Sequence, residues 1–565
     1  MSEGDQASAN KGILELKAFM LERHLTWPDP PFSYVEPLGV LLDLAFNWRI
    51  GLWFDASPLV STFDAESRHP WSLFIEPGTF VGAWAVQNED VIHGGAYTSY
   101  WNSLRDAFSE GSPTAESDQV DVDKIAARET EILSALYKVT LSTMKKPSRF
   151  SIRDIERYTP NISETLWTRE ITNVIASVSG RPMLEGMAST ITVSDVALIG
   201  AINRLYAKYT SRDILEHISW FFVQAFAPLA DRKFLVSKYG NRAMANAHRK
   251  DYCATEVEAA YRYLVVTLYT MQRFSSEVRA AIDLQLGSVK DAALEKIAAG
   301  HPTWADNSSR EFVATKVGSI KTILWPPFEL LDEANLFNIF GTPTANESSF
   351  GQHWTDVFYA TWGVLTDPRY AAAMKMPLNF VLPYFRYNYI SNSVLVSVAA
   401  LARPLYDTNG TASMTYGGLG FSYAAQLVRA FDNGGMAVHT DGNIAADSWS
   451  SASWKWGSRS KLECLKPFYD SPFPEIPALE IAHAAFRRAL ANDSELLRLV
   501  TPDYTEEQVF FITACFTLCT IESSTGSFYG GDCNKAAKNY APFAEAFGCR
   551  DGAPMKPANV CSYFD

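Results

Sequence analysis

A glycine-rich turn that leads into a short apolar helix constrains the fold of this chain more than any other stretch. Residues 416–456 read YGGLGFSYAAQLVRAFDNGGMAVHTDGNIAADSWSSASWKW. Apolar residues dominate from Leu419 to Phe431, which predicts a helix that packs in a core. A turn-rich Asp/Asn/Gly segment follows, and then a cluster of tryptophans at 449, 454 and 456. From these residues alone, a core helix and the remnant of an active site are both open interpretations.

The order of these features resembles the active-site region of the neprilysin and endothelin-converting-enzyme family of zinc metallopeptidases. In that family a Gly-Gly-Ile-Gly run opens the zinc helix, Gly-Phe-Asp closes it, and Asp-Gly-Asn-Leu leads to a Trp-rich helix. The matching residues here are Gly417–Gly420, Phe431–Asp432 and Asp441–Ile444. The resemblance implies a mainly α fold with a small β component (α+β) and two lobes. The expected lobes are a larger helical one, residues 1–375, and a thermolysin-like one, residues 376–565.

The chemistry of that family is missing from the matching helix. A zincin helix places two histidines at i and i+4 on one face, with a glutamate between them as general base. Counted from Gly420, these three positions fall on Ala425, Gln426 and Arg429. Ala425 has no donor atom, Gln426 cannot accept a proton at neutral pH, and Arg429 carries a permanent cation that repels a metal ion. The sequence therefore predicts an inactive protein without the zinc cofactor.

The third zinc ligand of the family begins a Glu-Asn-Ile-Ala-Asp motif, whose aspartate orients a histidine. The motif aligns with residues 474–478, so that Pro474 replaces the ligand and Ala478 replaces the aspartate. A slip of one residue would instead place Glu475 at the ligand position. Because a buried unpaired guanidinium is costly, Arg429 is predicted to pair with Glu475 or Glu480.

The substrate-binding elements of the family are also altered. Runs of β-prone residues at 384–389 and 394–399 predict a hairpin. In the family the first strand carries an Asn-Ala pair that grips the substrate backbone by strand addition. By the resemblance these substrate-strand positions fall on Tyr384 and Phe385, which are expected to fill a core pocket or an exposed aromatic edge. No histidine follows His483, so the oxyanion-stabilising histidine of the family has no counterpart.

The end of the chain resembles the family most closely. The stretch FAEAFGCRDGAPMKPANVCSYFD, from Phe543, matches its closing pattern, and the resemblance implies a disulfide between Cys464 and Cys561. It also implies that Cys253, Cys519 and Cys549 match cysteines whose partners lie in an N-terminal segment that precedes this chain's first residue. Cys515 and Cys533 have no family counterpart and are left to pair with each other or with an orphan. A metal site at Cys515 and Cys519 is a further alternative.

Composition excludes several classes of partner. The chain has 565 residues and a formal net charge of -14, which argues against nucleic acid or an anionic membrane surface. No apolar run reaches the roughly 18 residues of a membrane-spanning helix. The first residues, MSEGDQASANKG, show no signal-peptide pattern and by themselves predict a cytosolic protein.

Two other features predict an extracellular, secreted glycoprotein. Six of the seven cysteines lie from residue 464 onward, a distribution typical of disulfides formed in an oxidising compartment. Five N-x-S/T sequons are candidate glycosylation sites, at Asn161, Asn307, Asn346, Asn409 and Asn492. We give these features more weight than the first residues.

Helical periodicity dominates the chain up to about residue 375. Asp121, Ser194 and Ser211 are expected to begin helices, and residues 255–271 predict a further long helix.

Three functional hypotheses follow. The first is a catalytically inactive homologue that works as an extracellular scaffold and binds peptides or proteins in the cavity between the lobes. The second is an active metalloendopeptidase with a displaced metal site, for which His439, His483 and Glu480 are the nearby candidates. The third is a truncated, non-functional product, which the unpaired cysteines favour.

Overall fold

The computed structural model describes residues 6–60, 71–87, 96–109, 121–141, 145–177, 189–340, 376–377, 379, 383–440, 442, 444, 450–465, 474–490, 493–519, 521–523, 526–529 and 533–564. The chain forms two compact units. Unit 1 comprises Met1–Ala260 and Ile339–Thr366, and unit 2 comprises Tyr261–Asn338 and Asp367–Asp565. This grouping assigns residues 261–338 to the C-terminal unit, because helices there pack against helices beyond residue 420. The family boundary at 375/376 stays a prediction.

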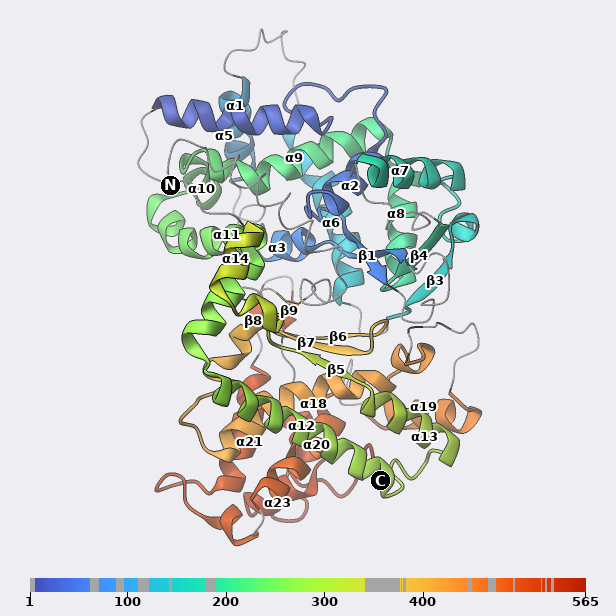
Figure 1. Cartoon of the computed structure of the whole chain (residues 1–565), viewed down its shortest axis with the longest axis vertical. Coiled ribbons are helices and arrows are strands. Elements are labelled where there is room, and N and C mark those ends of the chain that lie inside the picture. The colour runs from blue at the N-terminus through green and yellow to red at the C-terminus, as the bar shows by residue number, and fades with distance from the viewer. Residues whose placement is uncertain are drawn as a thin grey trace. The chain divides into compact units, whose positions relative to one another are not determined.

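Unit 1 is mainly helical, with one four-stranded sheet (Figure 1). Its helices are α1 (Gln6–Glu22), α2 (Pro37–Phe46), α3 (Thr79–Gln87), α5 (Tyr97–Ser109), α6 (Val122–Leu141), η2 (Ile152–Arg157), α7 (Glu164–Ser177), α8 (Val196–Lys208), α9 (Ser211–Ala230), α10 (Lys233–Tyr239) and the first part of α11 (Arg242–Arg273). Its strands are β1 (Phe54–Val60), β2 (Trp71–Pro77), β3 (Ser148–Ser151) and β4 (Thr190–Val193), in the order β1-β2-β4-β3. β2 and β4 are parallel, and the outer pairs are antiparallel.

The core of unit 1 is built around one aromatic side chain and one buried carboxylate. Trp220 of α9 contacts the rings of Trp27, Tyr97, Tyr100 and Trp101. Beside it, the buried Glu129 of α6 accepts hydrogen bonds from the side chains of Trp84, Tyr97, Trp220 and Gln224. The polar groups of these aromatic side chains, together with the carboxamide of Gln224, thereby satisfy a carboxylate that would otherwise be costly to bury.

Besides the second part of α11, unit 2 contains a further set of helices, one of which ends in unit 1. They are α12 (Ser276–Ala298), α13 (Asn307–Gly318), η5 (Phe328–Leu330), α14 (Glu333–Phe340), η7 (Val398–Leu401), α17 (Ala412–Thr415), η8 (Tyr416–Gly420), α18 (Phe421–Val428), η9 (Arg429–Phe431), η10 (Gly435–Ala437), α19 (Ala452–Leu465), α20 (Glu475–Ala489), η12 (Asp493–Leu497), α21 (Glu506–Thr517), α22 (Cys533–Lys538) and α23 (Ala541–Ala546). α18 contacts α12 and α20, which makes it the central helix of this unit.

Two small sheets complete unit 2. β5 (Lys321–Ile323), β6 (Phe385–Asn388) and β7 (Ser393–Val396) form a sheet in the order β5-β7-β6, and β8 (Ile521–Ser523) pairs with β9 (Gly526–Tyr529). β6 and β7 are antiparallel, which confirms the predicted hairpin, with Phe385 opposite Val396. The order leaves β6 at one edge of its sheet.

The ends of several helices test the sequence reasoning. Asp121 precedes α6 and accepts a hydrogen bond from Lys124 N at 3.2 Å, as expected. α8 is capped by Asp195 and not by Ser194, so this prediction is wrong by one residue. α9 begins at Ser211 as predicted, and Thr210 caps it. A capping side chain must accept from the N–H two or three positions later, and these neighbours meet that condition. Residues 255–271 lie within α11 as predicted.

The described helices were also compared with the length and hydropathy that a bilayer requires. None of them is both long and apolar enough to cross a membrane.

Candidate functional site

The double glycine sets the position of α18. The preceding turn, η8, is a single turn of π-helix that packs against α21. A Cβ atom added at Gly417 would lie 2.5 Å from the carbonyl oxygen of Phe510, and one at Gly418 would lie 2.3 Å from that of Leu405. Both distances are shorter than real Cβ contacts, so the backbones can approach this closely only at glycine.

We expect Gly418→Ala to lower the free energy of unfolding of unit 2 by about 1–3 kcal/mol, because the added methyl group meets a backbone carbonyl that cannot move freely. Gly287→Ala on α12 is the matched control, since an added Cβ there has nothing within 4 Å. Alanine should stabilise that helix slightly. Denaturant midpoints measure both variants, and equal effects would contradict the steric argument.

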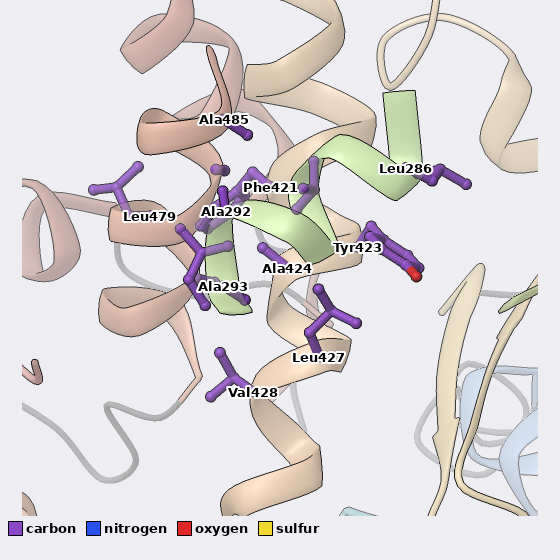
Figure 2. Close-up of a cluster of buried hydrophobic side chains, with 14 of the residues drawn as sticks. Leu286, Ala292, Ala293, Phe421, Tyr423, Ala424, Leu427, Val428, Leu479 and Ala485 are labelled. Carbon is purple, nitrogen blue, oxygen red and sulfur yellow. The ribbon is translucent and has the colours of Figure 1, made fainter. Parts of the chain in front are cut away.

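α18 buries one side and leaves the other half-exposed. Figure 2 shows its buried side chains, Phe421, Tyr423, Ala424, Leu427 and Val428, among Leu286, Ala292 and Ala293 of α12 and Leu479 and Ala485 of α20. The half-buried residues are Ser422, Ala425, Gln426 and, directly after the helix, Arg429. Their spacing of three, four and seven residues places them along one face.

Gln426 binds the edge strand of the neighbouring sheet. Its Oε1 accepts a hydrogen bond from the backbone N–H of Tyr387, at a distance of 3.0 Å. Tyr387 lies on β6, and its hydroxyl in turn donates to Asn392 Oδ1 at 2.6 Å. The amide of Gln426 therefore ties α18 to β6 and satisfies a backbone donor at the sheet edge.

Arg429 belongs to a polar cluster centred on Asp432. Arg429 Nη1 lies 3.4 Å from Asp432 Oδ2, while the Tyr389 hydroxyl donates to the same oxygen at 2.6 Å. The backbone N–H of Gly435 donates to Asp432 Oδ1 at 2.7 Å. Burial raises the pKa of Asp432, although Arg429 opposes this effect. Burial alone would lower the pKa of Arg429, but Tyr389 and then Asp432 raise it above its usual value.

The predicted partner of Arg429 was wrong. Its direct partner is Asp432 and neither Glu475 nor Glu480. Glu475 lies near enough to interact electrostatically with Arg429, and burial raises its pKa. Glu480 instead lies 3.5 Å from Lys296 and accepts from the backbone N–H of Tyr563 at 3.1 Å. Asp432 lies three residues after Arg429, at the end of the helix, and this spacing was the signal in the sequence.

A buried lysine holds the loop that carries Asp432, and sequence reasoning missed it. Lys316 of α13 is fully buried, and its ammonium donates to the carbonyl oxygens of Gly435 and Val438. No pattern around Lys316 in the sequence marks this role, because its partners are backbone atoms more than a hundred residues away.

The two predicted substrate-strand positions lie on or beside β6. Phe385 is buried, and Tyr384 packs partly buried against the same hydrophobic core. The carbonyl oxygen of Tyr384 accepts from Ser397 N at 2.9 Å, so it is used within the hairpin. Both aromatic side chains thus contribute to the core of unit 2.

The comparisons with known proteins agree on one family. The N-terminal model of the family described as Peptidase family M13 matches residues 71–326. Endothelin-converting enzyme 1 of Homo sapiens is 21% identical over 412 residues, which cover 68% of this chain and 52% of the relative. The structure entitled Haemonchus galactose containing glycoprotein complex has a TM-score of 0.64 at 16% identity, covering 98% of this chain and 89% of that one. The family model and these relatives support membership of the neprilysin and endothelin-converting-enzyme family, M13.

A second solved structure shows the same fold. It is a zinc metalloprotease of Mycobacterium tuberculosis in complex with inhibitor, with a TM-score of 0.62, 14% identity, and coverage of 98% of this chain and 88% of that one. The two-lobed, mainly helical fold of the M13 family is therefore the fold of this chain, as predicted. The chain spans about half to two thirds of the length of the curated relatives it matches, 52% and 66% for the first two.

The residues predicted to stand at the zinc positions of the family do not fit a zinc ion. Zinc in proteins is bound by nitrogen, sulfur or oxygen atoms of side chains. Ala425 offers a methyl group, Arg429 a cation, and Pro474, which directly precedes α20, no donor atom. Ala478, at the position of the orienting aspartate, is fully buried. Within the part of the chain that the structure describes, no group of three or more His, Cys, Asp or Glu side chains could hold a metal ion.

The residues proposed for a displaced metal site have other partners. His483 lies between the Tyr540 hydroxyl, 2.9 Å from Nδ1, and the Glu507 carboxylate, 2.5 Å from Nε2. His439 packs against the ring of Phe312, and Glu480 accepts from Tyr563. The three side chains do not form a described metal-binding group.

The cysteines are partly resolved into pairs. Cys515 and Cys533 form a disulfide with a Cα–Cα distance of 5.1 Å, which settles one of the pairings that the sequence left open. Cys561 is also disulfide-bonded, whereas the side chain of its expected partner, Cys464, lies outside the described part. Cys253, Cys519 and Cys549 are free thiols.

The candidate glycosylation sites fall into two groups. Asn161, Asn307 and Asn409 are exposed, as a glycan acceptor must be. Asn346 and Asn492 lie outside the described residues.

Proposed function

We propose that this M13 homologue is catalytically inactive and acts as an extracellular scaffold that binds peptides or proteins. One observation carries the proposal. The half-buried face of α18 presents a methyl group, a carboxamide and a guanidinium where its family presents two imidazoles and a carboxylate.

The surrounding contacts support a loss of function and not a rearranged active site. Gln426, at the position of the general base, is engaged with Tyr387 N, and a carboxamide cannot accept a proton at neutral pH. Arg429 is engaged with Asp432, so a cation stands at the second ligand position. Without a metal ion, a base or a polarised water, hydrolysis of an amide bond has no catalyst at this site.

An extracellular location is supported by the covalent chemistry of unit 2. The disulfide between Cys515 and Cys533, and the oxidised state of Cys561, are typical of proteins that fold in an oxidising compartment. The exposed sequons at Asn161, Asn307 and Asn409 are consistent with glycosylation there. Peptide or protein partners are proposed because M13 proteases take peptides.

Metal analysis and a peptide-cleavage assay test this proposal. We expect the purified chain to contain well below one zinc ion per molecule. We also expect no chelator-sensitive cleavage of fluorogenic peptides. Human endothelin-converting enzyme 1, handled in the same way, is the positive control. One bound zinc per chain together with chelator-sensitive cleavage would overturn the proposal and support a displaced metal site.

A further inference from the structure

On the half-buried face of α18, the hydrogen-bond acceptors have partners within the chain, whereas most donors have none among the described residues. Its acceptors are already used: Gln426 Oε1 accepts from Tyr387 N. The carboxylate of Asp432 accepts from the Tyr389 hydroxyl and from Gly435 N, as well as from Arg429. Each acceptor oxygen of these two side chains therefore already has at least one partner within the chain.

Most hydrogen-bond donors of the same face have no partner among the described residues. Arg429 makes a single long hydrogen bond of 3.4 Å, and no second partner of its guanidinium lies among the described residues. Nε2 of Gln426 likewise has no described partner. A guanidinium carries five N–H donors and a carboxamide two, so most of these donors have no partner within the described part of the chain. With its side chain 22% exposed, Arg429 can be reached from solvent.

A buried acidic group faces the same place. Glu475, at the start of α20, interacts electrostatically with Arg429, yet its buried Oε2 has no hydrogen-bond partner among the described residues. Burial raises the pKa of Glu475, which favours its protonated form. A polar atom buried without a partner costs free energy, and a bound ligand would remove that cost.

We propose that Gln426 and Arg429 receive a carboxylate group of a peptide at the place where other M13 members hold zinc. The geometry suits this guest, because the two donors stand three residues apart on one face and an arginine fork matches the two oxygens of a carboxylate. The methyl group of Ala425, on the same face, offers no competing polar atom. The carboxylate comes from a peptide C-terminus or from an acidic side chain. This site rests on the proposed binding function and specifies its ligand chemistry.

Calorimetric titration with three small probes tests the site. The first probe is N-acetyl-Phe-Leu with a free C-terminus, the second is its C-terminal amide, and the third is N-acetyl-Glu-Leu amide. We expect at least one of the two carboxylate probes to bind at least about tenfold more tightly than the uncharged amide, since charge-assisted hydrogen bonds are the strongest of their kind. Binding of the first probe assigns a C-terminus, and binding of the third assigns an acidic side chain.

Variants separate the site from non-specific attraction. Arg429→Met should weaken the binding of the carboxylate probe at least about tenfold, and Gln426→Leu should weaken it less. Arg459→Met is the matched control, because Arg459 is 82% exposed on α19 and should not matter. Thermal unfolding verifies that each variant is folded. Arg429→Lys keeps the charge but loses the two parallel N–H donors of the guanidinium, so it should bind the carboxylate probe with intermediate affinity.

Three results would overturn the inference: equal binding of the acid and amide probes, unchanged affinity in folded Arg429→Met, or no binding of either carboxylate probe. If the protein is also free of metal and inactive, each of these results contradicts the carboxylate site but not the proposed inactivity. Bound zinc in the separate metal analysis would instead remove the proposed inactivity.

Discussion

Asp432→Ala should destabilise unit 2 by about 3–5 kcal/mol, the range expected when one partner of a buried ion pair is removed. The side chain of Asp432 is only 10% exposed and accepts three hydrogen bonds. Its removal leaves the Tyr389 hydroxyl, the Gly435 N–H and the Arg429 guanidinium without their acceptor. Chemical denaturation, followed by the intrinsic fluorescence of the chain, measures the loss.

The order of three variants makes this prediction specific. Asp432→Asn keeps one acceptor oxygen and should cost less than Asp432→Ala. Arg429→Met should cost the least of the three, because Asp432 retains its two shorter hydrogen bonds, to Tyr389 and Gly435. If Arg429→Met were the most destabilising variant, the cluster would be organised around the arginine and not around the aspartate.

Glu256→Gln should stabilise unit 1 by a few kcal/mol near pH 8. Glu256 of α11 is 6% exposed, and its Oε2 has no hydrogen-bond partner among the described residues. Burial raises the pKa of this carboxyl from 4.5 to about 8. Each pKa unit corresponds to about 1.4 kcal/mol of differential stability, so a neutral side chain of the same shape removes a large penalty.

The sign of the pH dependence follows from linkage. Above pH 4.5 the unfolded chain releases the Glu256 proton, whereas the folded chain keeps it up to about pH 8. The stability of the protein therefore falls as the pH rises through this window. His217 has the opposite effect at lower pH, because burial lowers its pKa from 6.5 to about 3. Burial also lowers the pKa of Lys238 from 10.5 to about 8. Comparing Glu256→Gln with the unmodified chain cancels the contributions of His217 and Lys238, which both proteins share.

Denaturation curves at pH 6.5, 7.25 and 8 test the sign. The difference in stability between Glu256→Gln and the unmodified chain should grow with pH across this range. Glu22→Gln is the control, since Glu22 is exposed on α1 and should show no such trend. A constant difference between Glu256→Gln and the unmodified chain would mean that Glu256 is already ionised in the folded protein.

The steric demands of the site could be predicted from the sequence, and for a physical reason. Gly417 and Gly418 are required where two backbones approach closely, so their presence in the right order marks the start of α18. The runs of β-prone residues likewise predicted the hairpin of β6 and β7, because β-branched and aromatic side chains favour strands. Both signals are local in the chain, and local signals survive in a divergent sequence.

Apart from the spacing of three residues between Arg429 and Asp432, the sequence held no signal for the partners within the site, since they depend on how the elements end and pack. Arg429 follows the last residue of α18, and the turn of η9 returns the chain so that Asp432 reaches the guanidinium. Gln426 and Tyr387 are separated by 39 residues and meet only through the packing of α18 against β6. The pairing of Cys515 with Cys533 was one of several that the spacing allowed, and only the fold selects it.

The bond between Gln426 and Tyr387 has a consequence for the behaviour of the protein in concentrated solution. Strands at the rim of a sheet invite the strands of other molecules to pair with them, which is a common route to aggregation. The carboxamide of Gln426 occupies one of the backbone donors through which β6 would recruit such a neighbour. The hydrogen bond to Gln426 therefore leaves one donor fewer at this edge for pairing with another molecule.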